Sequence, residues 1–356
     1  MSSPLSTGPA GAHFESKVGA HYLLSMLVEA SARGLPGTII DRVEMQRAPQ
    51  GMHLDDVIVR AHDRAGKAAT LEIQVKRTIT FAPKDPVFRE VVGQIAKAAA
   101  KPEFWTANHQ LGIATSATSR KINGPYQDVL TWARQIGDAK TFMEQVERAG
   151  TSNEDARSFV ATFRSHLKEA AAPHDDETVW KILRRLHILT FDFTAPESSA
   201  QELAQERCAR ALEPGEAGRA ADLWKVLTEV ATEAASSAGD LDRPRLLEEL
   251  QKSSFRLAPA SSNAGALRIL ADLSWSALED IDDAVSGVSL PRTDYVSAVH
   301  TALDEHRYVD RHQLGLDRAH RDVRPGGNWT LAASPPKPEP VLLDCAPARS
   351  KLRSSR

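Results

Sequence analysis

The chain has 356 residues with a nearly balanced charge, a formal net charge of −3 at pH 7 and a pI near 6.5, which excludes a uniformly basic nucleic-acid-binding protein. Any contact with DNA must therefore come from a local patch. The two cysteines, Cys208 and Cys345, exclude a disulfide scaffold. Without a signal peptide or an apolar run long enough to cross a bilayer, the sequence predicts a cytoplasmic protein with no membrane partner.

The first third of the chain predicts a mixed α/β domain. Residues 1–12 are small and form a flexible N-terminus, and apolar side chains from Phe14 onward recur at helical spacing. Asp85 and Pro86 form a helix start, a capping side chain followed by a proline at the first helical position. The predicted order is helix, three strands, helix and strand, at residues 13–33, 38–46, 54–60, 69–77, 85–99 and 110–118. These elements define a domain over residues 13–125.

The remainder of the chain predicts helices followed by a segment without regular structure. Amphipathic helical patterns dominate residues 126–310, which we predict to be a mostly α-helical regulatory or linker domain without chemistry of its own. One stretch within it, His187 to Phe193, is typical of a strand. Prolines and glycines break every regular pattern after residue 311, so residues 311–356 are predicted to be a disordered tail.

One predicted strand, at residues 69–77, carries the functional interpretation. Its apolar residues at positions 71, 73 and 75 alternate with Glu72, Gln74 and Lys76. Successive side chains of a strand point to opposite faces, so an acid, an amide and an amine lie side by side on one face. A turn at residues 63–67 pairs this strand with the preceding one. That pairing brings Asp56 near Gln74 and Lys76.

A carboxylate, an amide and a lysine on adjacent strands are the groups that a metal-dependent phosphodiesterase uses. Mg²⁺ prefers oxygen ligands and keeps several waters, so one or two carboxylates and a carbonyl suffice to hold it. Asp56, the side-chain oxygen of Gln74 and the backbone carbonyl of Val75 are the candidate ligands. Lys76 is the candidate for holding the attacking water or stabilising the anionic transition state.

Further acids lie near these positions in the sequence. Glu15, Asp55 and Glu72 are candidates for auxiliary roles. Alternating charged residues on a hairpin are also typical of a solvent-exposed face. The alternative interpretation is therefore that these groups only stabilise the hairpin.

The motif formed by Asp56 and Gln74-Val75-Lys76, within the order helix, three strands, helix and strand, resembles the PD-(D/E)xK nuclease superfamily. Gln74 stands where the commoner acid would be, as in the Mrr-like branch of that superfamily. Residues from about Phe14 to Thr118, roughly a third of the chain, are similar to the double-stranded-DNA endonuclease domain of CBASS effectors and STAND-type antiphage proteins. The usual Pro-Asp pair is absent, because Leu54 precedes Asp55.

This resemblance implies a restriction-endonuclease-like fold and an endonuclease that cleaves double-stranded DNA with Mg²⁺ or Mn²⁺. It implies Asp56, Gln74 and Lys76 as the core site, assisted by Glu15 on the first helix, and a role as the effector of a bacterial antiphage defence system. The alternative is a non-catalytic DNA-binding or adaptor protein that retains the nuclease scaffold. Whether the chain forms a homo-oligomer stays open.

Two further expectations concern partners. Six basic residues are candidates for a DNA-facing surface, namely Arg77, Lys84, Arg89, Lys97, Arg120 and Lys121. The sequence contains no Gly-x-x-x-x-Gly-Lys-Ser/Thr motif, so the NTPase module of the STAND-type relatives is missing from it. We expect a truncated or frame-shifted member of that group, with a natural disordered tail as the alternative.

Overall fold

The computed structural model describes residues 8–258, apart from residues 64, 117, 149, 151 and 194–197. These residues belong to a compact unit that spans residues 1–259. The predicted tail at residues 311–356 lies outside the described residues. Within the described part of the chain, no helix is both long enough and apolar enough to cross a membrane.

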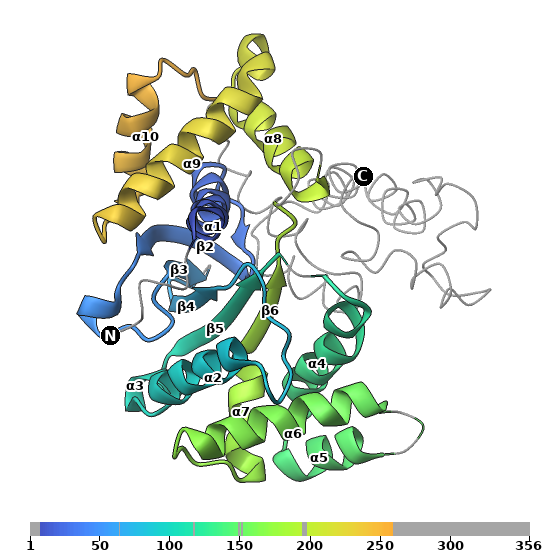
Figure 1. Cartoon of the computed structure of the whole chain (residues 1–356). Helices are drawn as coiled ribbons and strands as arrows, with labels where there is room; N and C mark the ends of the chain where they lie inside the picture. The colour runs from blue at the N-terminus through green and yellow to red at the C-terminus, as the bar shows by residue number, and fades with distance from the viewer. Residues whose placement is uncertain are drawn as a thin grey trace, which may run out of the picture. The chain divides into compact units, whose positions relative to one another are not determined.

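A mixed sheet forms the centre of this unit (Figure 1). Its strands lie in the order β1 (Ser31–Ala32), β2 (Leu35–Met45), β3 (Val57–Asp63), β4 (Ala68–Val75), β5 (Asn108–Thr115) and β6 (Leu186–Thr190), and β7 (Asp240–Asp242) pairs with β2. In β1 to β4 each strand is antiparallel to its neighbour, whereas β5 and β6 run parallel to β4. The end of β2, the start of β3 and the end of β4 therefore meet at one edge of the sheet.

One group of helices shares a core with one face of this sheet (Figure 1). The group consists of α1 (Pro9–Leu27), α8 (Ser199–Ala211), α9 (Ala220–Ser236) and α10 (Arg243–Lys252). Phe14 and Val18 of α1 are buried with Leu71 and Ile73 of β4, as the helical and strand spacings predict. Burial of such apolar side chains is the main stabilising contribution to this layer.

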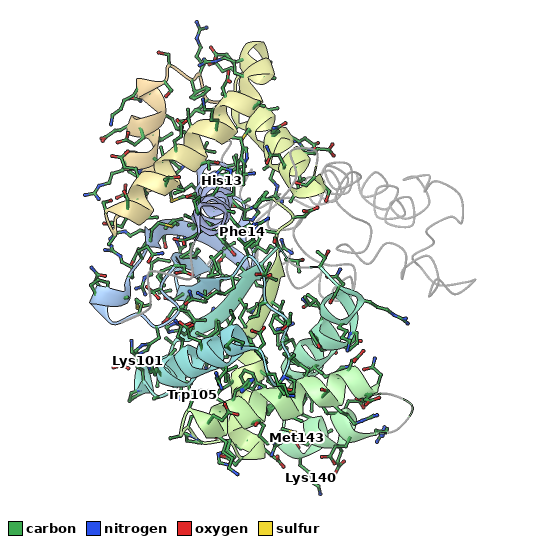
Figure 2. The ribbon with its side chains drawn as sticks, viewed as in Figure 1. His13, Phe14, Lys101, Trp105, Lys140 and Met143 are labelled. Atoms are coloured by element: carbon green, nitrogen blue, oxygen red, sulfur yellow. The ribbon has the colours of Figure 1, made fainter. Side chains whose placement is uncertain are left out.

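A second group of helices covers the opposite face, where Leu111 and Ile113 of β5 join its core. The group consists of α2 (Pro86–Ala99), α3 (Pro102–Thr106), α4 (Gln127–Gln135), α5 (Ala139–Glu147), α6 (Glu154–Glu169) and α7 (Asp176–Arg185). Asp85 caps α2 as predicted, because its side chain accepts a hydrogen bond from the backbone nitrogen of Val87. Short helical turns connect the elements at Ala48–Gln50, Ile122–Tyr126 and Pro214–Arg219. Figure 2 labels Phe14 of the first core and Met143 of the second.

The sheet is covered on both faces, and this changes the expected environment of β4. The sequence predicted an apolar face and a polar face, yet Glu72 and Gln74 on the polar face are only 1% and 2% exposed. The reason is that β4 lies between β3 and β5, and helices cover both sides of this parallel part of the sheet. Two polar side chains are therefore held inside the protein, where each needs a partner.

Several predicted boundaries differ from the structure. The first helix begins at Pro9, within the residues 1–12 that were predicted to be flexible, because a proline is favoured at the first helical position. The first helix ends at Leu27 rather than at residue 33, because the chain reverses at Glu29, whose φ is 54°, and enters β1. The predicted domain boundary after residue 125 falls inside the compact unit. Strand β6 extends the sheet beside β5, and α9 packs against α1, so the helical segment and the first third of the chain share their cores.

Candidate active site

Asp56 lies at the sheet edge where β2 ends, β3 begins and β4 ends. The register of the strands explains this position, since Met45 pairs with Val57 and Val57 pairs with Ile73. Asp56 directly precedes β3, and the last two residues of β4 lie beside it. The hairpin thus brings the predicted carboxylate and amide together, as the turn between β3 and β4 led us to expect.

The carboxylate of Asp56 is held by three donors. Its Oδ2 accepts hydrogen bonds from the backbone nitrogen of Val75, at 2.7 Å, and from Nε2 of Gln74. Its Oδ1 accepts from Nε2 of Gln46 at 3.3 Å. Val75 therefore contributes its N–H to Asp56, in addition to the carbonyl that the sequence suggested as a metal ligand. These contacts distinguish Asp56 from Asp55. Burial raises the pKa of Asp55, and hydrogen bonds from its own amide and that of Ala48 act to lower it.

Gln46 is a member of this site that sequence reasoning missed. Its Nε2 also donates to Oε1 of Glu15 at 2.6 Å, so a single amide bridges the carboxylates of Glu15 and Asp56. Gln46 follows β2 with a φ of 53°, in the left-handed region, where a non-glycine residue is strained. The sequence offered one indication of its role, because Gln46 directly follows the strand β2, which ends beside Asp56. The left-handed conformation was not visible in the sequence.

The electrostatics of the site favour a bound cation. Burial raises the pKa of Asp56 to about 8, with a further upward contribution from Glu15, while the charge of Lys76 acts in the opposite direction. Burial likewise raises the pKa of Glu15 and of Asp55, and Lys76 again opposes both shifts. Three carboxyl groups thus lie within the field of one half-buried lysine. If all three were ionised, their negative charge would exceed what Lys76 alone can neutralise.

One orphaned atom also fits a metal ion. The Oε1 of Gln74 is buried without a hydrogen-bond partner, next to the carboxylate of Asp56. An unsatisfied buried acceptor costs about 1–3 kcal/mol, so an ion or a water at this position would stabilise the fold. The oxygens of Asp56, Gln74 and Glu15 are of the type that Mg²⁺ prefers. Among the described residues, no group of three His, Cys, Asp or Glu side chains is arranged to hold a metal, so amide or backbone oxygens must complete such a site.

The site is enclosed rather than open. Asp55 and Asp56 are each 8% exposed and Glu15 is 7% exposed, whereas Lys76 is half-buried. Lys76 is therefore the most exposed of these four side chains.

Glu72 is not part of this cluster. Its Oε2 accepts from the backbone nitrogens of His53 and Leu54, both at 3.4 Å, and its Oε1 lies 2.7 Å from Nε2 of His109. Burial acts to raise the pKa of Glu72, but the hydrogen bond and charge of His109 more than reverse this effect and lower it. Its contacts indicate that Glu72 anchors the loop before β3 to the sheet, and its role as an auxiliary acid stays a prediction.

The predicted basic residues are divided between several places. All six side chains are exposed, but Nζ of Lys121 forms an ion pair with Asp155 at 2.7 Å, which neutralises its charge. Arg77 directly follows Lys76, and its carbonyl accepts from the backbone nitrogen of Ser116 after β5. Lys84 and Arg89 lie at the start of α2, on the same side of the sheet as the end of β4, and Arg120 follows β5 closely. Lys97 lies two turns further along α2.

Comparison with known proteins adds little to this description. No protein-family model matches the sequence, and no curated protein matches it. The chain has a structural similarity to a Moraxella osloensis Cap4 SAVED/CARF-domain containing receptor, with a TM-score of 0.37 and 10% sequence identity. The match covers 69% of this chain and 48% of that receptor, so the chain spans about half the length of the structure that it matches.

Proposed function

We propose that the protein is a metal-dependent endonuclease that hydrolyses phosphodiester bonds of double-stranded DNA. The observation that carries this proposal is the convergence of Asp56, Gln74 and Glu15 beside Lys76, with one buried amide oxygen left without a partner. The order α1, β2, β3, β4, α2 and β5 agrees with the order expected for a restriction-endonuclease-like fold. The role in bacterial antiphage defence rests on the family resemblance alone.

Each residue of the site has a role that follows from its chemistry. Asp56 and Gln74 would hold a Mg²⁺ or Mn²⁺ ion, with Glu15 close by and the carbonyl of Val75 as a further oxygen. When bound, such an ion polarises the phosphate and lowers the pKa of a water that attacks it. Lys76 would orient that water or stabilise the negative charge that develops on the phosphate oxygens. Gln46 would keep the two carboxylates at a fixed separation.

DNA would approach along the exposed side of this edge. Arg77, Lys84, Arg89 and Arg120 are exposed there and would contact phosphate groups. Contacts of this kind bind duplexes of any sequence and weaken as the salt concentration rises. Lys121 would contribute less, because it is paired with Asp155.

The second candidate is a non-catalytic DNA-binding or adaptor protein that keeps this scaffold. The enclosure of the three carboxyl groups, each less than a tenth exposed, favours this candidate. It requires DNA binding without strand cleavage, and it requires no metal at Asp56.

Cleavage of supercoiled plasmid by the full chain, in Mg²⁺, Mn²⁺ or EDTA, distinguishes the two candidates. We expect nicked and linear products with metal only, and a loss of about 10²–10³ in rate for Asp56→Ala. Asp55→Ala is the matched control, since its side chain is equally buried and adjacent, and we expect it to lose less than about tenfold. Retarded plasmid with no cleavage in any metal would support the adaptor instead.

A further inference from the structure

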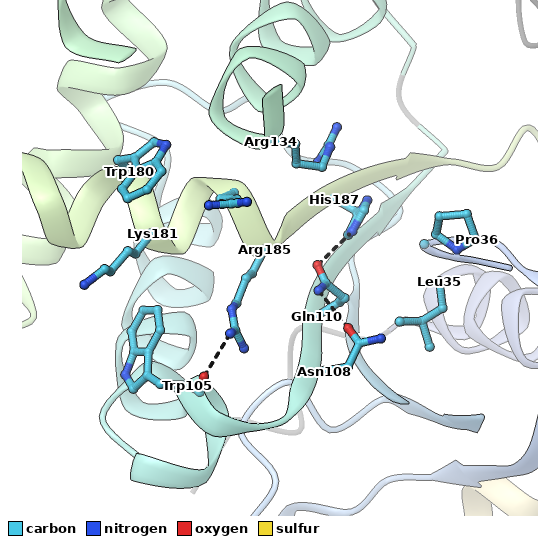
Figure 3. Close-up of a pocket in the computed structure, with 12 residues that line it drawn as sticks. Leu35, Pro36, Trp105, Asn108, Gln110, Arg134, Trp180, Lys181, Arg185 and His187 are labelled. Atoms are coloured by element: carbon cyan, nitrogen blue, oxygen red, sulfur yellow. Dashed lines mark hydrogen bonds between the residues drawn. The ribbon is translucent and has the colours of Figure 1, made fainter. Parts of the chain in front are cut away.

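A second polar site lies at the opposite edge of the sheet, where β5 and β6 begin. A groove of about 710 Å³ opens there (Figure 3). Its floor carries Asn108 and Gln110 of β5 and His187 of β6. The turn at residues 34–36 and the helices α3, α4 and α7 form its walls. The volume lies within the range of about 300–1,000 Å³ that is typical of small-ligand sites.

The groove is positively charged. Four of its lining residues are basic, namely Arg134, Lys181, Arg184 and Arg185, and none of the described residues that line it is Asp or Glu. Two of the four are already engaged. Lys181 pairs with Glu177 at 2.9 Å, and the guanidinium group of Arg185 donates to backbone carbonyls, including those of Trp105 and Ala107, each at 3.1 Å.

The other two arginines present donors to the groove. Arg134 donates from Nη1 to the carbonyl of Leu186 at 3.0 Å, which fixes its orientation and uses one of its five N–H groups. Arg184 is exposed, with its guanidinium carbon 5.4 Å from the centre of the Trp180 ring. A planar guanidinium group binds phosphate oxygens in a bidentate manner, so both side chains have the chemistry of a phosphate contact.

The floor offers a row of neutral hydrogen-bonding groups. Nε2 of His187 lies 3.3 Å from Oε1 of Gln110, and Nε2 of Gln110 donates to Oδ1 of Asn108 at 3.3 Å (Figure 3). Burial, with a smaller contribution from Arg134, lowers the pKa of His187 to about 3, so its ring is neutral near pH 7. Neutral amide and imidazole groups donate and accept at once, as the edge of a nucleobase requires.

We propose that this groove binds a small phosphate-bearing ligand of mononucleotide size. The phosphate would contact Arg134 and Arg184, and the polar edge of the base would contact Gln110 and His187. This site is separate from the acidic cluster at the other edge of the sheet. It does not depend on the proposed nuclease activity.

Calorimetric titration of the full chain with AMP, ATP, inorganic phosphate and adenosine tests the proposal. We expect AMP or ATP to bind more tightly than either phosphate or adenosine, because only a nucleotide engages both ends of the groove. Arg184→Glu should weaken nucleotide binding at least about tenfold, since it replaces a charge-assisted donor by a repelling acid. The side chain is exposed, so this variant should fold.

The matched control is Lys140→Glu on α5, which makes the same charge change at a side chain that is 87% exposed and is labelled in Figure 2. Its nucleotide affinity should stay within about twofold of the parent, as expected of a surface charge outside the site. A second variant, Gln110→Leu, should weaken AMP binding and leave the affinity for phosphate unchanged.

Three results would overturn the proposal. The first is that neither nucleotide binds the parent protein at millimolar concentration. The second is that Arg184→Glu binds nucleotide as the parent does. The third is that Arg184→Glu loses affinity for duplex DNA with no change for nucleotides, which would make the groove part of the DNA surface.

Discussion

The two edges of the central sheet carry charged groups of opposite sign, which are buried to different degrees. At the edge where β4 ends, three carboxyl groups are buried around the single ammonium group of Lys76, and the pKa of Asp56 rises to about 8. At the edge where β5 and β6 begin, the basic side chains stay in an open groove, and backbone carbonyls hold Arg134 and Arg185. The acidic edge therefore carries a stability cost that a bound cation would remove. At the basic edge, burial lowers the pKa of Arg134 and of Arg185, and hydrogen bonds to backbone carbonyls offset part of this cost.

This difference in the burial of charged groups predicts where substitutions should affect chemistry and where they should affect binding. Buried charges interact strongly because little water screens them. Exposed charges are screened by water and salt, and each contributes less than about 1 kcal/mol to stability. We therefore expect large, specific effects at the acidic edge and smaller, ligand-dependent effects at the groove.

Lys76→Met should have the largest effect. It keeps the aliphatic stem but removes the charge that opposes the raised pKa values of Asp56 and Glu15, so we expect a loss of about 10²–10³ in the rate of DNA cleavage. Lys140→Met, at an exposed lysine on α5, should leave the rate unchanged. Equal cleavage rates for Lys76→Met and the parent, with equal melting temperatures, would show that Lys76 takes no part in catalysis.

Gln46→Gly should have an intermediate effect that separates positioning from stability. The substitution removes the amide that bridges Glu15 and Asp56, and it also relieves the left-handed backbone at this position. We expect cleavage to fall about tenfold, while the free energy of unfolding changes by less than about 1 kcal/mol, because the two effects on stability oppose each other. Urea unfolding and plasmid cleavage of the same preparation measure both. A large loss of stability with normal activity per folded molecule would make Gln46 purely structural.

His187 should give the smallest effect, and it acts on stability at the groove edge. Its pKa is about 3 in the folded protein and 6.5 in the unfolded chain, so the unfolded chain binds the extra proton first. Stability from this group is complete above pH 6.5 and falls as the pH drops toward 3. Solvent in the groove limits the effect, and we expect the parent to lose about 1 kcal/mol more than His187→Asn between pH 7 and pH 5. Parallel stability profiles for the two proteins would contradict a buried, neutral His187.

Local sequence patterns were sufficient to predict part of this architecture. The alternation in β4 and the turn before it set the hairpin register, and that register places Asp56 beside Gln74. The start of α2 was predictable because Asp85 and Pro86 satisfy a local rule about helix termini. Each of these predictions depends on residues that are close in sequence.

The features that sequence reasoning missed depend on distant residues. The contact of Glu72 with His109 of β5 was not predicted, because the two residues are far apart in the sequence. The pairing of β6 with β5 joins residues more than seventy positions apart, so no local pattern indicates it. The groove likewise combines the turn at Gly34 with Arg134 and His187. Long-range packing, rather than propensity, determines these contacts.

The proposed nuclease activity requires that the buried acids around Asp56 hold a divalent cation. Calorimetric titration of Mn²⁺ into the parent protein and into Asp56→Asn tests it directly, because the amide keeps the shape of the side chain and removes its charge. We expect the parent to bind Mn²⁺, and Asp56→Asn to bind it at least about tenfold more weakly while melting at a higher temperature without metal. Equal Mn²⁺ affinity in the two proteins, or no binding by the parent, would contradict a metal site at Asp56.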